Sequence, residues 1–315
     1  AMTFDISILQ MFAPLLVGGS TEIITDKNAH DPYLLLQDVE DKKITILEIV
    51  PSMLQMLLEL APEYKISSLG WLISTGEELD VKLAKNWISI YPQIPLLNAY
   101  GPTECSDDVT HYFITSVDCL DTDAVPIGKP IHNIQIYILD RDQSIVPTGT
   151  VGEICVTGAG VGPGYLFDTV KTTQSFIKNP FGFGRMYKTG DLGRYLADGR
   201  IMFLGRVDTQ VKVRGYRIEL REIELVLESY PDVERSIVLA REVDNSHDKN
   251  LVAYIKGKCA VEDIKQYLKG KLPDYMVPNY ILMVKEFKKT KNGKIDRNEL
   301  SRRILCSKTK NLLVI

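Results

Sequence analysis

The loop after a predicted strand at Leu96–Ala99 carries side chains that can contact a ligand. It reads NAYGPTE, from Asn98 to Glu104. In open α/β sheets, ligands bind at the carboxyl ends of the strands, because the loops there line a crevice. Tyr100 offers a flat apolar face at this position. The alternative is a turn built on Gly101-Pro102 with a solvated Glu104.

Two further polar residues have side chains suited to binding. Asp191, in the stretch YKTGDL (Tyr187–Leu192), has a carboxylate that can accept hydrogen bonds from two neighbouring hydroxyls. Arg206 has a guanidinium that can pair with phosphate oxygens. The alternatives are a turn aspartate after Gly190 and a surface salt bridge.

Glu48 interrupts an apolar stretch, Ile44–Val50, that is predicted to be a buried strand. A buried carboxylate without a partner is costly, so Glu48 needs a cation. That cation can belong to a substrate or to a Lys or Arg of the protein. Both alternatives stay open at this stage.

The elements that position these residues indicate an α/β fold. Strands are predicted at Ile44–Val50, Leu69–Thr75 and Leu96–Ala99, with a helix between the last two that Asp80 can cap. The inner face of this helix is predicted to carry Leu83, Trp87 and Ile90. Alternation of strands and helices favours a mostly parallel, covered sheet. An apolar helical pattern from Thr3 ends at Gly18-Gly19, before a short predicted strand at Thr21–Thr25.

Later parts of the chain follow different patterns. Short strands at Gln135–Asp140 and Gly152–Gly158 indicate a small β-rich subdomain. Gln210–Leu220 alternates apolar and charged residues around Gly215, which predicts a hairpin with one buried face. Helices and strands of a compact α+β unit are predicted beyond it: Arg221–Tyr230, Arg235–Glu242, Asn250–Lys256 and Val261–Lys271.

Composition narrows the class of protein. The chain has 315 residues, 45% hydrophobic and 25% charged, with a net charge of −4. These values are ordinary for a globular protein and give no reason to expect a nucleic-acid partner. No apolar run is long enough to span a bilayer. The five cysteines are scattered, with no zinc-binding spacing, so we expect free thiols and a cytoplasmic location.

Taken together, these motifs carry a family resemblance. The stretch Gly205–Glu224 (GRVDTQVKVRGYRIELREIE) resembles the hinge and first strands of the C-terminal subdomain in adenylate-forming enzymes. Four other motifs occur along the chain in the order typical of that superfamily: NAYGPTE, YKTGDL, Leu272–Pro278 (LPDYMVP) and Asn292–Arg297 (NGKIDR). The chain most closely resembles the amino-acid adenylation domains of nonribosomal peptide synthetases.

The resemblance implies roles for individual residues. Tyr100 would stack on the adenine of ATP, and Thr103 would contact a phosphate oxygen. Asp191 and Arg206 would contact ribose or phosphate oxygens. Asn98 and Gly101 would line the nucleotide site as residues of the same loop. Glu104 would bind Mg2+, a hard cation that prefers carboxylate oxygen. Lys294 would be the catalytic lysine, acting with Thr103 and Glu104, because an ammonium offsets the charge that builds as a carboxylate attacks phosphorus. Asp208 would be the hinge.

Two other stretches are given structural interpretations. Gly152–Leu166 (GEICVTGAGVGPGYL) is rich in glycine but does not lead into a helix through Lys-Ser or Lys-Thr, so it is no phosphate-binding loop. It resembles a structural segment of the family, with Pro163 where many relatives have Arg. Lys212 is predicted to be a solvated strand residue, although the resemblance places its region near the carrier's pantetheine arm.

The family's amino-acid pocket can also be carried over onto this chain. Asp5, in Phe4–Ser7 (FDIS), would hold the α-ammonium of the substrate, with an N-cap as the alternative role. The pocket positions are Asp5, Ile6, Leu9, Glu48, Ile73, Thr75, Ala99, Asp107, Asp108 and Lys294. Glu48, Asp107 and Asp108 make this set acidic. We therefore expect a basic, arginine-like substrate, or another polar amino acid.

The predicted organisation has three parts. Residues 1–207 form the later part of a large adenylation subdomain with parallel sheet layers and a small β-barrel, residues 208–300 form a C-terminal lid, and residues 301–315 form a linker. The expected partners are an amino acid, the phosphopantetheine thiol of a carrier protein, and a missing N-terminal portion of the adenylation domain, on the same or a separate chain. The alternatives are a stand-alone ligase of the same superfamily and an inactive half-domain that binds a complementary fragment.

Overall fold

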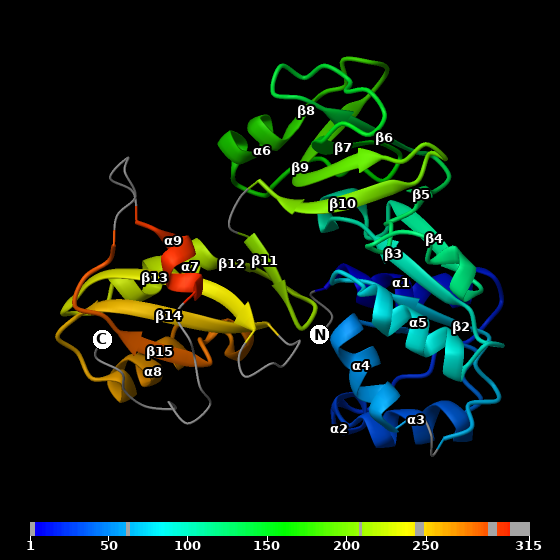
Figure 1. Ribbon diagram of the computed structural model, residues 1–315, viewed down its shortest axis with the longest axis horizontal. Coiled ribbons are helices and arrows are strands. Elements are labelled where there is room, and N and C mark those ends of the chain that lie inside the picture. Colours follow the sequence, from blue (N-terminus) through cyan, green and yellow to red (C-terminus); the bar gives the residue numbers. More distant parts are fainter. Residues whose placement is uncertain (1–3, 61–63, 208–209, 243–248, 289–294, 303–315) are drawn as a thin grey trace. The chain divides into compact units, whose positions relative to one another are not determined.

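The chain folds into two compact units, residues 1–208 and 209–315 (Figure 1). The computed structural model describes residues 4–60, 64–207, 210–242, 249–288 and 295–302. Two of the predicted site residues, Asp208 and Lys294, lie outside these ranges, as does most of the predicted linker. The last described helix, α9, runs from Arg297 to Arg302.

The first unit contains a five-stranded sheet in the order β1-β2-β3-β4-β5. Strands β1, β2 and β3 are parallel, as predicted, whereas β4 and β5 are antiparallel to their neighbours. The strands are β1 (Ile46–Ile49), β2 (Trp71–Ser74), β3 (Leu96–Tyr100), β4 (Thr110–Ile114) and β5 (Lys129–Pro130). The carboxyl ends of the three parallel strands therefore meet at one edge, where a ligand site is expected.

Helices precede and connect the parallel strands. They are α1 (Asp5–Leu16), α2 (Asp26–His30), α3 (Pro32–Asp41), α4 (Pro51–Leu60) and α5 (Val81–Ile90). Helix α5 begins where predicted, because the Asp80 carboxylate accepts hydrogen bonds from the main-chain N–H groups of Lys82 and Leu83. The indole N–H of Trp87, which is 1% exposed, donates to the Ile94 carbonyl at 2.9 Å.

Two local predictions in this part are wrong. Ile90 is 42% exposed, and the inner face of α5 carries Ala84, Trp87 and Ile88 instead. The centre of the buried stripe therefore lies about a third of a turn from Ile90. Residues 21–25 contain no strand, and Thr25 instead caps α2 by accepting from the Asn28 N–H.

A second, antiparallel sheet completes the first unit. Its order is β10-β9-β7-β6, and β8 pairs with β9. The elements are β6 (Ile134–Leu139), β7 (Gly152–Gly158), α6 (Thr169–Ser175), β8 (Phe176–Lys178), β9 (Arg185–Tyr195) and β10 (Ile201–Arg206). Ile138, Ile154 and Val156 are fully buried between these elements. The predicted β-rich subdomain is present, with strands close to the predicted bounds.

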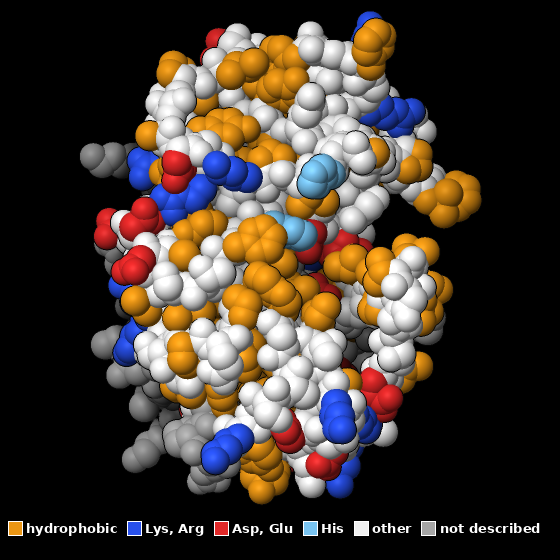
Figure 2. Space-filling view, turned by 90° about the vertical axis from the view of Figure 1, so that its right-hand side faces the viewer, with side chains coloured by type: hydrophobic (Ala, Val, Ile, Leu, Met, Phe, Trp, Pro, Cys, Tyr) orange, Lys and Arg blue, Asp and Glu red, His pale blue; other side chains and the backbone are white. Residues whose placement is uncertain are grey.

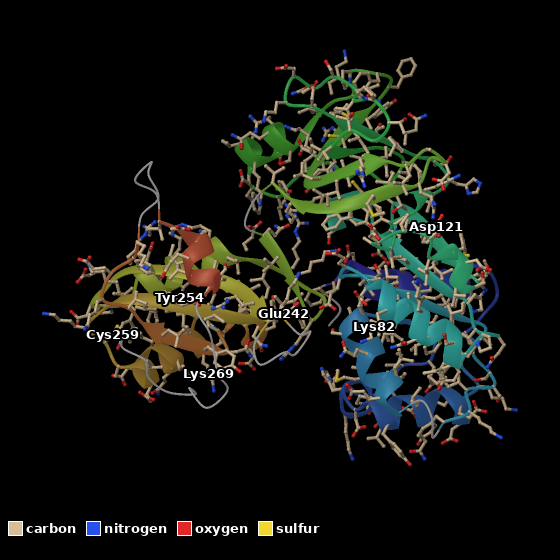
Figure 3. The ribbon with its side chains drawn as sticks, in the orientation of Figure 1. Lys82, Asp121, Glu242, Tyr254, Cys259 and Lys269 are labelled. Carbon is tan, nitrogen blue, oxygen red and sulfur yellow. The ribbon has the colours of Figure 1, made fainter. Side chains whose placement is uncertain are left out.

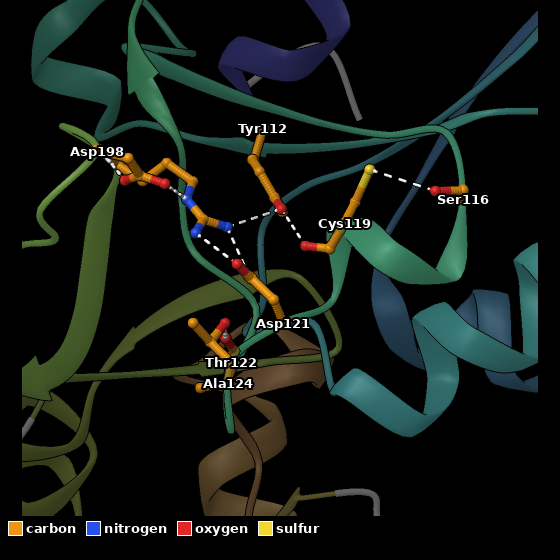
Figure 4. A network of polar contacts seen from close by, with 8 residues as sticks. Tyr112, Ser116, Cys119, Asp121, Thr122, Ala124 and Asp198 are labelled. Atoms are coloured by element: carbon orange, nitrogen blue, oxygen red, sulfur yellow. Dashed lines mark hydrogen bonds and ion pairs between the residues drawn. The ribbon is translucent and has the colours of Figure 1, made fainter.

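A network of polar contacts that includes Tyr112, Asp121 and Asp198 joins the β9–β10 turn to the first sheet, and Figure 4 labels these three residues. Arg200 is at its centre. Its guanidinium donates to both carboxylate oxygens of Asp121, at 2.8 and 3.0 Å. It also donates to the Tyr112 hydroxyl in β4 at 3.0 Å, and it pairs with Asp198 in the turn. One side chain thereby joins residues that lie 79 and 88 positions earlier in the sequence.

The second unit begins with the predicted hairpin. Strands β11 (Gln210–Val213) and β12 (Tyr216–Glu219) pair across Arg214 and Gly215, both of which have positive φ. Such a turn favours glycine because a Cβ is strained in the left-handed region. The other elements are α7 (Leu220–Glu228), β13 (Val233–Glu242), β14 (Lys249–Gly257), α8 (Val261–Lys269) and β15 (Tyr280–Met283).

Helices pack on both faces of the β13-β14-β15 sheet. Ile223 of α7 and Ile264 of α8 share one core with Ala253 of β14. On the other face, Tyr254 (Figure 3) packs with Leu300 of α9 and donates its hydroxyl to the Leu300 carbonyl at 3.1 Å. Alternate residues of β14 thus enter two different cores, as the period of two along a strand requires.

A buried carboxylate organises the polar contacts of this unit. Glu224 of α7 is 1% exposed, and its Oε1 accepts from the Val238 N–H at 3.0 Å and from Arg297 at 2.7 Å. Arg221 pairs with the other oxygen at 3.1 Å. Because a buried charge is tolerated only when it is paired and hydrogen-bonded, these contacts hold α7, β13 and α9 together.

Candidate functional site

The NAYGPTE loop folds back on itself immediately after β3. Asn98 is buried, and its amide donates to the Pro126 carbonyl at 2.9 Å. A Cβ on Gly101 would lie 1.6 Å from the Asp107 carbonyl oxygen, so only glycine fits there. The turn then passes through a 3-10 segment, η2 (Thr103–Cys105), before β4 begins. Thr103 is exposed at this turn.

Three of the predicted nucleotide residues meet beside this loop. The Tyr100 hydroxyl donates to Asp191 Oδ2, and Arg206 Nη1 lies 2.5 Å from Asp191 Oδ1. Burial, followed by the nearby Asp191 charge, raises the pKa of Tyr100 well above its ordinary value. Tyr100 and Asp191 are 91 residues apart in the sequence. The tertiary structure therefore places NAYGPTE, YKTGDL and the end of β10 at one site.

Asp191 keeps acceptor capacity for a ligand in this arrangement. Each oxygen of an ionised carboxylate has two lone pairs, and each Asp191 oxygen has one protein donor in the contacts described above. Its side chain is 9% exposed, and that of Arg206 is 18% exposed. The ion pair is thus largely buried, unlike the surface salt bridge considered as the alternative for Arg206.

Glu104 is held by tyrosines. The Tyr165 hydroxyl donates to Glu104 Oε1 at 2.6 Å, and the Tyr187 hydroxyl lies 3.2 Å from that of Tyr165. Glu104 is therefore not the freely solvated glutamate of the alternative interpretation. Sequence reasoning assigned no role to Tyr165, although its place at the end of a glycine-rich segment was a signal of close packing.

The chemistry of Glu104 fits a magnesium ion bound together with a nucleotide. Within the part of the chain that the structure describes, no group of three or more His, Cys, Asp or Glu side chains could hold a metal. Magnesium usually keeps several waters and takes only one or two carboxylates besides substrate phosphates. One well-held carboxylate is consistent with that requirement.

The predicted amino-acid pocket lies at the carboxyl edge of the parallel strands. Glu48 in β1 is paired in register with Ile73 in β2, and Ala99 lies near the end of β3. The Thr75 hydroxyl donates to Asp108 Oδ1 at 3.4 Å. Thr75, Ala99, Asp107 and Asp108 are all buried. The structure therefore brings most of the predicted pocket together.

Helix α1 supplies the remaining described members, Asp5, Ile6 and Leu9. These side chains are half-buried, and Gln10 donates to the Glu48 main-chain oxygen at 3.4 Å. Asp5 is the first residue of α1, directly after the N-cap position at Phe4, and its Oδ1 accepts from the Ile6 N–H at 3.0 Å. The Asp5 charge contributes to the electrostatics of Glu48.

Glu48 is an acid of this pocket whose pKa is strongly raised. Burial, together with the charges of Asp108 and Asp107, raises the pKa of Glu48 to about 8. Its Oε1 is buried, and among the described residues it has no hydrogen-bond partner. No ion pair joins Glu48 to a Lys or Arg among the described residues, which do not include Lys294, so the protein-cation alternative stays open. Figure 2 shows one face of the molecule, and acidic side chains lie inside a hollow on it.

His111 lies beside two of the predicted pocket residues, and sequence reasoning missed it. It follows the acidic pair in β4, and its Nε2 lies 3.2 Å from Asp108 Oδ2. Its Cα is paired in register with that of Ala99, a predicted pocket residue. The alternation of side chains along a strand offered no reason to connect it with Asp108, because that contact depends on the turn before β4.

Apolar side chains are also exposed on the face of the molecule that Figure 2 shows. In α1, no residue is buried, and Ile8, Phe12 and Leu15 are each about half exposed, at 51%, 50% and 54%. Ile46 at the start of β1 is 56% exposed. No helix among the described residues is long and apolar enough to cross a membrane.

Family models match both units of the chain. Residues 1–166 match the model described as AMP-binding enzyme, and residues 222–294 match that of the AMP-binding enzyme C-terminal domain. Together these models cover the NAYGPTE loop, Glu48 and residues 222–294 of the second unit. The predicted family and the predicted α/β fold are thereby confirmed.

Curated relatives include large peptide synthetases. The chain is 41% identical over 303 residues to tyrocidine synthase 2 of Brevibacillus parabrevis, which covers 95% of this chain and 8% of that protein. It is 36% identical over 305 residues to gramicidin S synthase 2 of Aneurinibacillus migulanus, covering 95% and 7%. The chain thus spans less than a tenth of the length of these two relatives.

A solved structure agrees with this assignment. The chain matches holo-PA1221, a nonribosomal peptide synthetase protein with adenylation and PCP domains bound to a vinylsulfonamide inhibitor, with a TM-score of 0.85 and 31% identity. The match covers 95% of this chain and 52% of that one. The fold of the o-succinylbenzoate CoA synthetase of Bacillus subtilis is also similar, with a TM-score of 0.79 and 23% identity.

Proposed function

The chain belongs to the AMP-binding enzyme family, and we propose on that basis that it takes part in ATP-dependent activation of an amino acid as aminoacyl-AMP. The observation that carries the proposal is the cluster of Tyr100, Asp191 and Arg206 at one site. The synthetase relatives support a second step, transfer of the acyl group to the phosphopantetheine thiol of a carrier protein.

The proposed chemistry has two half-reactions. In the first, a carboxylate oxygen of the amino acid attacks the α-phosphorus of ATP, the bond to the β-phosphate oxygen breaks, and pyrophosphate leaves. In the second, the thiol sulfur attacks the acyl carbon, AMP leaves with the electrons of the broken C–O bond, and the thiol proton passes to solvent. The first half-reaction is reversible, which provides an assay.

Each residue of the site has a proposed part in this chemistry. Tyr100 presents its ring to adenine, Asp191 accepts from the ribose hydroxyls, and Arg206 and Thr103 contact ribose or phosphate oxygens. Glu104 would hold Mg2+, whose charge stabilises the phosphates when it is bound. The catalytic role of Lys294 and the hinge role of Asp208 remain proposals from the sequence, since both lie outside the described residues.

For the substrate, we propose a basic amino acid with an arginine-like side chain. Glu48, Asp107 and Asp108 form an acidic group at the strand ends, and Glu48 Oε1 has no hydrogen-bond partner within the described structure. A bound cation would offset the cost of burying the Glu48 charge. Asp5, at the start of α1, is proposed to hold the α-ammonium.

We further propose that a preceding portion of the same domain covers α1 in the active protein. The exposed apolar residues of α1 support this, because isolated surface helices normally bury one face. The proposed organisation remains a large subdomain ending near residue 207, a lid at residues 208–300 and a following linker. A cytoplasmic location is consistent with the four described cysteines being free thiols.

Amino-acid-dependent ATP–pyrophosphate exchange tests the proposal. We would measure exchange with all standard amino acids on this chain alone and on a longer protein that includes the preceding portion, with intact masses determined for both. Exchange with arginine or lysine is expected from the longer protein. Exchange with no amino acid in either sample would refute the proposed activity.

Two other functions of this family would give different results. A stand-alone ligase would pass the acyl group to coenzyme A or a small amine and would leave a carrier protein unloaded. An inactive half-domain would bind the complementary portion and raise its melting temperature, yet the complex would exchange no pyrophosphate.

A further inference from the structure

The glycine-rich segment of the second sheet lies directly against the turn that contains Glu104. The Gly162 N–H donates to the Glu104 carbonyl at 2.9 Å, and Ser106 Oγ donates to the Gly160 carbonyl at 2.9 Å. A Cβ on Gly160 would lie 2.6 Å from the Cys105 carbonyl oxygen. The segment therefore needs glycine at residue 160 to approach the turn so closely.

Tyr165, at the end of this segment, continues the contact to the Glu104 side chain. Its hydroxyl donates to Glu104 Oε1 at 2.6 Å, across 61 residues of sequence. Since that donation uses the Tyr165 proton, the Tyr187 hydroxyl is the donor in the 3.2 Å contact between the two tyrosines. Two consecutive hydrogen bonds thus connect Tyr187 in YKTGDL to the carboxylate of Glu104 in NAYGPTE.

Tyr165 is itself fixed by contacts that do not use its hydroxyl. Its main-chain N–H donates to Thr172 Oγ1 at 2.8 Å. Its ring packs edge-on against Phe176, with centroids 5.4 Å apart, and Lys171 Nζ lies 4.7 Å from the ring centroid. A phenylalanine in place of Tyr165 can keep these contacts and lose only the hydroxyl.

We propose that Tyr165 is a positioning residue that orients Glu104 for the metal ion bound with ATP. A carboxylate that ligates a metal is usually held by hydrogen bonds from neighbouring groups, and loss of such a partner weakens metal binding about 10–100-fold. The glycine-rich segment thereby acts as a support for the metal ligand. This inference rests on the proposed function, because it takes Glu104 as the ligand.

The test measures metal binding rather than turnover. Mn2+ would be titrated in the presence of a non-hydrolysable ATP analogue and followed by electron paramagnetic resonance, using the longer protein. Tyr165→Phe is expected to raise the Mn2+ dissociation constant about tenfold or more, and Tyr187→Phe is expected to raise it by a smaller factor. The matched control is Tyr195→Phe, whose hydroxyl donates to the Ile136 carbonyl at 2.7 Å in the same sheet.

A second comparison separates positioning from general stability. In a Glu104→Gln background, Tyr165→Phe is expected to cause no further loss of Mn2+ affinity, because the oriented carboxylate is already gone. An equal loss in both backgrounds would overturn the inference, as would wild-type affinity in Tyr165→Phe. Equal Mn2+ binding by wild type and Glu104→Gln would also overturn it.

The proposed activity and the proposed positioning role of Tyr165 are refuted by different measurements. Absence of pyrophosphate exchange in the wild-type protein refutes the proposed activity, while the Mn2+ titration still reports on Tyr165 and Glu104. Normal exchange combined with unchanged Mn2+ binding in Tyr165→Phe refutes only the positioning role.

Discussion

Binding of a basic amino acid should release a proton from Glu48. Its pKa of about 8 in the empty pocket means that about nine-tenths of the molecules carry this proton at pH 7. A substrate cation beside the carboxylate favours the ionised form, so the proton must leave. We therefore expect release of about 0.9 proton per arginine at pH 7 and about 0.1 at pH 9.

The same linkage fixes the sign of the pH dependence. The acid pKa is raised above its ordinary value of 4.5, so binding of a cation is weakened below pH 8 and reaches a plateau above it. The dissociation constant for arginine should fall about fivefold from pH 7 to pH 8 and about ninefold from pH 6 to pH 7. An amino acid with a neutral side chain should show neither effect.

Calorimetry in two buffers with different ionisation enthalpies measures the proton count directly. Glu48→Gln should abolish the release, while Glu78→Gln, at an exposed glutamate near the same sheet, should leave it unchanged. His111→Gln identifies any proton exchanged by the imidazole beside Asp108. Release below about 0.2 proton at pH 7, or equal release in Glu48→Gln, would refute the reasoning.

Two further predictions concern stability. Arg200→Ala removes both hydrogen bonds to Asp121 and should lower the melting temperature by a few degrees. The control is Arg194→Ala, at an exposed position, which should leave the melting temperature unchanged. Equal effects of the two substitutions would contradict the stabilising role of Arg200. Glu224→Gln should cost the second unit about 1–3 kcal/mol in urea unfolding, because it removes the charge that pairs with Arg297, whose own side chain is 33% exposed. A smaller loss in Glu224→Gln combined with Arg297→Met would confirm that the cost arises from the broken pair, and a fully additive loss would argue against it.

Local chemistry explains most of the elements that were predicted correctly. Asp80 caps α5, Gly215 allows the β11–β12 turn, and the apolar strands of the first sheet lie within two residues of their predicted bounds. Each of these signals depends on a few neighbouring residues. Ile90 was misplaced because helical periodicity allows adjacent stripes, and packing against the sheet chose the one with Ile88.

Residue types and their order along the chain were sufficient to identify the family. Which side chains meet was settled by folding. Tyr100 reaches Asp191 across 91 residues, and Tyr165 reaches Glu104 across 61. The raised pKa of Glu48 likewise arises from burial and from aspartates that follow it by about 60 positions. Hydrogen bonds and electrostatic interactions act over a few ångströms of space, so a linear sequence cannot specify them until the chain has folded.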